Sequence, residues 1–77
     1  MIKVLFFAGI KEEIGLDQLI VEKKNITVLH LKQYIKSTYP SVPLNHCLIA
    51  VNENFVTDDE ILKDQDVIAF IPPVSGG

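Results

Sequence analysis

The chain has 77 residues, of which 48% are hydrophobic and 22% charged, and its formal net charge is −3. A chain of this length and composition predicts one small domain, and its apolar content excludes an intrinsically disordered protein. All seven basic residues are lysine, which argues against a nucleic-acid-binding protein, since such proteins concentrate arginine and lysine on one face.

The first part of the sequence predicts two strands. Residues 2–8 (IKVLFFA) are rich in β-branched and aromatic side chains, which favour a strand. Residues 9–15 predict a turn or a single helical turn that Gly15 ends, because glycine adopts positive φ without steric cost. Residues 16–22 predict the second strand. The apolar opening is too short to span a membrane and lacks a small-residue cleavage site, so we expect a soluble cytoplasmic protein.

Residues 26–40 carry the one clear helical pattern. Thr27 is expected to cap the helix, and Ile26 and Leu31 are placed to form a hydrophobic staple around it. Pro40 prevents the helix from continuing. The apolar spacing predicts one buried stripe, formed by Val28, Leu31, Ile35 and Thr38.

The remaining elements are short. Residues 47–51 (CLIAV) predict a buried strand, the polar residues 52–54 a turn, and residues 55–56 a short strand. Residues 60–66 (EILKDQD) are interpreted as another turn, and residues 67–71 (VIAFI) as the last strand.

This order of strands around one helix indicates an α+β domain, with one mixed sheet packed on one main helix. In so short a chain the order resembles the ubiquitin-like β-grasp. We expect residues 1–71 to form this domain and residues 72–77 to form an extended tail. Pro72 and Pro73 lack a backbone N–H and have fixed φ, so they end the strand and hold the chain away from the sheet.

The first and last predicted strands are apolar on both faces, with only Lys3 as a polar interruption in the first. A single helix covers one face of a sheet, so a second apolar face stays exposed unless loops fold over it. Such a patch on a small domain usually marks a protein contact. We expect the face that carries Lys3 to be the outer one, with Leu5, Phe7 and Phe55 as contact residues.

The side chains do not indicate catalysis or metal binding. Cys47 is the only cysteine, so the chain forms no internal disulfide and has no CxxC zinc or redox motif, and we expect its thiol to pack as a small hydrophobe. The acidic stretch TDDEILKDQD predicts either a solvated loop or an acidic rim that steers a basic partner.

The chemistry is instead expected in the tail, where Val74, Ser75, Gly76 and Gly77 follow the two prolines. Residues 72–77 span up to about 20 Å when extended. The two glycines have no Cβ and could enter a channel too narrow for other residues. The reactive group would be the α-carboxylate of Gly77, which an adenylyl group from ATP converts into a mixed anhydride open to sulfur or nitrogen nucleophiles.

The opening MIKVLFFAG, the AVN turn and above all DVIAFIPPVSGG resemble the small subunit of molybdopterin synthase, over essentially the whole chain. The resemblance implies that a ubiquitin-activating-like adenylyltransferase adenylates Gly77 with ATP. The carboxylate then becomes a thiocarboxylate, with sulfur from a donor protein. The tail enters the active site of the large subunit and gives its sulfur to cyclic pyranopterin monophosphate, which builds the dithiolene of molybdopterin.

The resemblance also implies a heterotetramer of two small and two large subunits, with the catalytic lysines on the large subunit and no cofactor bound by the small one. The matching contact positions are Phe7, Phe55 and Ile71, although the family often has an aromatic residue where Ile71 stands. Two alternatives stay open: a sulfur carrier for thiamin synthesis or tRNA thiolation, and a ubiquitin-like interaction module or protein modifier. None of these functions involves a membrane or nucleic acid as a binding partner of this chain.

Overall fold

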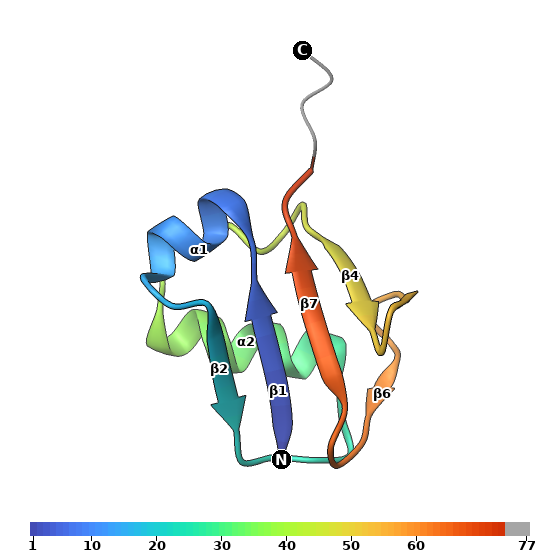
Figure 1. The fold of residues 1–77 in the computed structure, drawn as a ribbon. Coiled ribbons are helices and arrows are strands. Elements are labelled where there is room, and N and C mark those ends of the chain that lie inside the picture. Colours follow the sequence, from blue (N-terminus) through green and yellow to red (C-terminus); the bar gives the residue numbers. More distant parts are fainter. Residues whose placement is uncertain (74–77) are drawn as a thin grey trace.

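A mixed sheet and one helix lying across it dominate the computed structural model (Figure 1), which describes residues 1–73. Val74, Ser75, Gly76 and Gly77, all of them predicted tail residues, lie outside the described residues. In chain order the elements are β1 (Ile2–Phe6), α1 (Ala8–Ile14), β2 (Gln18–Val21), β3 (Ile26–Thr27), α2 (Val28–Thr38), β4 (Leu48–Val51), β5 (Asn54–Phe55), β6 (Ile61–Leu62) and β7 (Val67–Ile71).

The main sheet has five strands in the order β2-β1-β7-β4-β5. The two ends of the described chain meet at its centre, where β1 and β7 run parallel. β2 and β4 flank this pair in antiparallel orientation, so the sheet is mixed, as predicted. Helix α2 crosses behind the sheet and covers one of its faces (Figure 1).

The hydrophobic core lies between the sheet and α2. Alternate residues of the central strands face the helix, and Val4 of β1 and Ile68 of β7 are fully buried there. The rings of Phe6 and Phe70 stack in this layer with centroids 6.3 Å apart. From the helix, Val28, Leu31 and Ile35 fill the space opposite. In β1 the buried side chains are Ile2, Val4 and Phe6, which face away from Lys3. The prediction that the Lys3 face is the outer one is therefore confirmed.

Helix α2 begins at the predicted N-cap and ends before Pro40, as the sequence predicts, but its buried stripe is shorter than expected. The side chain of Thr27 accepts a hydrogen bond from the backbone N–H of His30, at 3.1 Å, which confirms it as the N-cap. Thr38, which was expected in the buried stripe, is exposed, so that prediction was wrong. Tyr39 packs against the core instead. It follows Val28 by about three helical turns and so lies on nearly the same side of the helix axis.

Two local predictions need correction. The segment after β1 forms the helix α1, of seven residues, rather than one turn; Gly15 ends it with φ 83°, and its N–H donates to the carbonyl of Lys11. The predicted turn at residues 60–66 contains β6, which pairs antiparallel with β3 in a separate two-stranded sheet. Leu62 is fully buried in this pairing. Within residues 1–73, neither helix has the length and apolar character needed to cross a lipid bilayer.

Candidate functional site

The outer face of the sheet carries a continuous apolar surface that the strand register assembles. One outward-facing residue from each of four neighbouring strands lies in a single row, in the order Leu5, Ala69, Ala50 and Phe55. Because partners in a register are close neighbours, side chains from distant parts of the sequence form one surface. In the adjacent row, Ile71 lies opposite Leu48 of β4.

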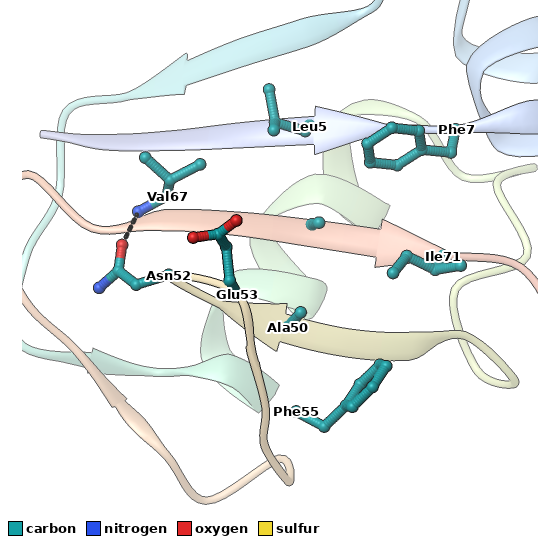
Figure 2. Close-up of a pocket in the computed structure, with 9 residues that line it drawn as sticks. Leu5, Phe7, Ala50, Asn52, Glu53, Phe55, Val67 and Ile71 are labelled. Carbon is teal, nitrogen blue, oxygen red and sulfur yellow. Dashed lines mark hydrogen bonds between the residues drawn. The ribbon is translucent and has the colours of Figure 1, made fainter.

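This surface is hollowed into a groove of about 580 Å³ (Figure 2). The four predicted contact residues, Leu5, Phe7, Phe55 and Ile71, all line it. The remaining apolar lining comes from Ala50, Val67 and Ala69. The two alanines have short side chains between the longer ones of Leu5 and Phe55, so the row has a low centre and raised ends. The structure thus brings together residues that the sequence only placed on one face.

Two aromatic side chains stand at the groove with large exposed fractions, 45% for Phe7 and 71% for Phe55. The alternative that loops fold over this face therefore fails for residues 1–73. Leu48, which sequence reasoning did not name, is also exposed beside them. Its signal was the alternation in LIAV, where Leu48 and Ala50 fall on the opposite side from Ile49 and Val51. Exposed aromatic groups in an apolar hollow are what a protein-docking surface needs.

The AVN turn fixes one side of the groove to the start of β7. Asn52 and Glu53 form a two-residue hairpin turn between β4 and β5, with φ of 50° and 72°. The amide of Asn52 donates to the carboxylate of Asp66 at 3.0 Å, and its oxygen accepts from the N–H of Val67 at 3.1 Å. The side chain of Asn52 therefore locks the hairpin onto the strand that leads to the tail.

The groove reaches the end of the sheet where β7 stops. Because β1 and β7 are parallel, Phe7, which directly follows β1, lies at the same end of the sheet as Ile71, the last residue of β7. Pro72 comes directly after Ile71. Phe7 is held in place because its carbonyl accepts hydrogen bonds from the first turn of α1, including one of 3.3 Å from Lys11. A partner seated on the groove would thus contact the chain immediately before the tail residues.

The acidic residues of the stretch TDDEILKDQD make their contacts elsewhere in the domain and do not line the groove. Asp58 accepts a hydrogen bond of 2.8 Å from the amino group of Lys32, and Asp66 accepts one of 2.8 Å from the N–H of Lys63 besides its bond to Asn52. The pKa of Asp64 is lowered, chiefly by a hydrogen bond from the N-terminal ammonium of Met1. None of these carboxylates lines the groove, which favours the interpretation as a solvated loop over that of a steering rim.

Cys47 behaves as the sequence predicts. It is half-buried, packs against the core just before β4, and its thiol donates to the carbonyl of Pro43 at 3.5 Å. Burial raises the pKa of the thiol, an effect that the charge of Lys32 opposes, so little reactive thiolate is present near neutral pH. In the described part of the chain, no three histidine, cysteine or acidic side chains lie close enough to hold a metal ion.

Comparisons with known proteins agree with this geometry. The chain is 41% identical over 81 residues to the Escherichia coli molybdopterin synthase sulfur carrier subunit, with 100% of both chains covered. Its structure is similar to a chain in the complex of subunits 1 and 2 of the Helicobacter pylori molybdopterin-converting factor (TM-score 0.73, 29% identity, 99% and 97% covered). The structure is also similar to that of SAMP1 from Haloferax volcanii (TM-score 0.81, 22% identity, 99% and 98% covered), a likeness that concerns the fold only. The predicted ubiquitin-like β-grasp is therefore confirmed. The ThiS family model matches residues 4–77, and the chain belongs to the ThiS family.

Proposed function

We propose that this protein is the sulfur-carrier subunit of a molybdopterin synthase. The observation that carries the proposal is its full-length similarity, at 41% identity, to the E. coli protein of that name. The motif PPVSGG directly after β7 and the apolar groove beside that strand support it. A carrier needs both a tail that reacts and a surface that positions it.

In this proposal the groove docks on the large subunit of the synthase, and two carriers and two large subunits form a heterotetramer. The H. pylori structure, in which a similar chain is in complex with a second subunit, supports a partner of this kind. Leu5, Phe7, Phe55 and Ile71 form the contact. Docking there would direct Pro72 and Pro73, and the residues after them, into the active site of the large subunit.

The chemistry takes place at Gly77 in three steps. A carboxylate oxygen attacks the α-phosphorus of ATP, held by a ubiquitin-activating-like adenylyltransferase, and pyrophosphate leaves. Sulfur at the oxidation level of hydrosulfide, supplied by a donor protein, then attacks the acyl carbon; the bond to AMP breaks as the C–S bond forms, giving a thiocarboxylate. In the synthase the sulfur bonds to cyclic pyranopterin monophosphate, and water cleaves the acyl C–S bond, which returns the Gly77 carboxylate; two loaded carriers supply one dithiolene. The carrier binds no cofactor itself, and the catalytic groups belong to its partners.

Intact-mass measurement tests the function directly. After incubation with ATP, the cognate adenylyltransferase and a sulfur source, we expect one oxygen of the carrier to be replaced by sulfur. The mass should revert when the large subunit and cyclic pyranopterin monophosphate are added. Covalent conjugates to lysine would favour a protein modifier instead. A thiocarboxylate that the synthase does not discharge would favour a carrier for thiamin synthesis or tRNA thiolation.

Replacing one aromatic side chain tests the docking surface. Phe7→Ala is expected to weaken binding to the large subunit by about 1–3 kcal/mol, because docking would bury a ring that is half exposed in the free carrier. Titration calorimetry measures the effect. Leu29→Ala, which removes an exposed apolar side chain from α2 on the other side of the sheet, is the matched control and should leave affinity unchanged. Equal affinities of wild type and Phe7→Ala would remove Phe7 from the interface.

A further inference from the structure

The hairpin turn between β4 and β5 places a carboxylate at the edge of the apolar groove. Among the described residues that line the groove, Glu53 is the only charged one. Figure 2 shows its side chain reaching from the turn towards β7, over the sheet face that the groove occupies. A charge at the edge of an otherwise apolar docking surface affects which partners can close over it.

The backbone at Glu53 is unfavourable for this residue type. Both central residues of the turn have positive φ, and the second position of such a hairpin turn strongly favours glycine. Asn52 tolerates this conformation and uses its side chain to bond β7. Glu53 has a φ of 72°, which is unfavourable for a residue with a Cβ, and its side chain makes no hydrogen bond that would compensate within the described residues. Among the non-glycine residues with positive φ in residues 1–73, Glu53 is the charged one, and residues in such conformations are often found at functional sites.

No interaction within the described chain explains the side chain either. Among residues 1–73 the ion pairs join Met1 to Asp64, Lys11 to Asp17 and Lys32 to Asp58. The carboxylate of Glu53 is exposed and makes no hydrogen bond to any other described residue. Its charge therefore contributes little to the fold, and it is available to another molecule.

We propose that Glu53 is a specificity-determining residue of the docking surface, and that the partner places an arginine or lysine side chain against it. The proposal rests on the proposed function, in which the large subunit fills the groove with apolar side chains. Closing the groove removes water from the carboxylate, and an unpaired carboxylate without water opposes binding. A partner with a cation at this point offsets that penalty, whereas a partner with an apolar or acidic group there is rejected.

The charge-removing variant Glu53→Gln tests the pairing. We expect it to bind the large subunit about tenfold more weakly at low salt, and to show a smaller loss of affinity as salt is raised. Binding is measured by titration calorimetry at two ionic strengths. Glu22→Gln, at an exposed carboxylate just past β2 that does not line the groove, changes the net charge equally and should leave the affinity unchanged.

The variant Glu53→Gly separates this role from a structural one. Glycine suits the turn, so the melting temperature of the free carrier should rise by about 2–8 °C while docking weakens. A purely structural residue would not change stability and affinity in opposite directions. If Glu53→Gln binds like wild type at both salt concentrations while Phe7→Ala binds weakly, the pairing is wrong and the docking surface stands. If neither change affects binding, the groove is not the docking surface, and both ideas fail.

Discussion

Deleting Gly77 alone is expected to abolish sulfur transfer while leaving the domain folded and able to dock. The shortened chain would still end in a carboxylate, on Gly76, but that group would lie about 3.5 Å short of its place in the two active sites. Reacting atoms that are misplaced by even about 1 Å can lose two orders of magnitude in rate. Product formation by the reconstituted synthase measures the loss, and thermal unfolding and calorimetry measure fold and docking.

A second tail variant distinguishes the effect of tail length from that of the space available around the last residue. Gly77→Ala keeps the length and the carboxylate and adds only a Cβ, so any loss of activity reports on the space around the last residue. Dithiolene formation by the truncated carrier at the wild-type rate would show that Gly77 does not carry the sulfur.

Phe70→Ala is expected to lower the free energy of unfolding by about 3–5 kcal/mol. The side chain is fully buried at the centre of the sheet, and its ring stacks on that of Phe6. Domains of this size have a total stability near the low end of about 5–15 kcal/mol, so this single change should leave a substantial unfolded fraction. Urea denaturation followed by circular dichroism measures it.

Phe55→Ala is the control for that experiment, since it removes the same ring from the opposite face. Phe55 is 71% exposed, and its loss should change stability by less than about 0.5 kcal/mol while weakening docking. Similar destabilisation by both substitutions would mean that the outer face contributes to the fold as much as the core does.

The sequence predicted the features that depend on local chemistry. Thr27 caps α2 because a hydroxyl before an apolar helix bonds the free N–H groups of its first turn, and Gly15 ends α1 because only a residue without Cβ adopts its φ cheaply. The outer apolar face was also predictable, since β1 and β7 lack the alternation of a half-solvated sheet and one helix cannot cover two faces.

The features that escaped prediction depend on residues far apart in the sequence. β6 is only two residues long and becomes a strand through its pairing with Ile26 and Thr27, which no local pattern indicates. The floor of the groove exists because Ala50 and Ala69 meet in one register pair. The position of Glu53 follows from the backbone of a hairpin turn whose sequence, Asn-Glu, lacks the expected glycine.

The parallel pairing of β1 with β7 has a consequence for how the protein is made. Strands from opposite ends of the described chain share the centre of the sheet, so the domain cannot close until the ribosome has released nearly all of it. The groove forms only when β7 has paired with β1, because β7 supplies a large part of its apolar lining. The β1 side contributes Leu5 and Phe7, and β7 contributes Val67, Ala69 and Ile71. In the proposed function, a nascent or prematurely terminated chain without β7 would therefore lack the groove, and would not compete with the intact protein for the large subunit.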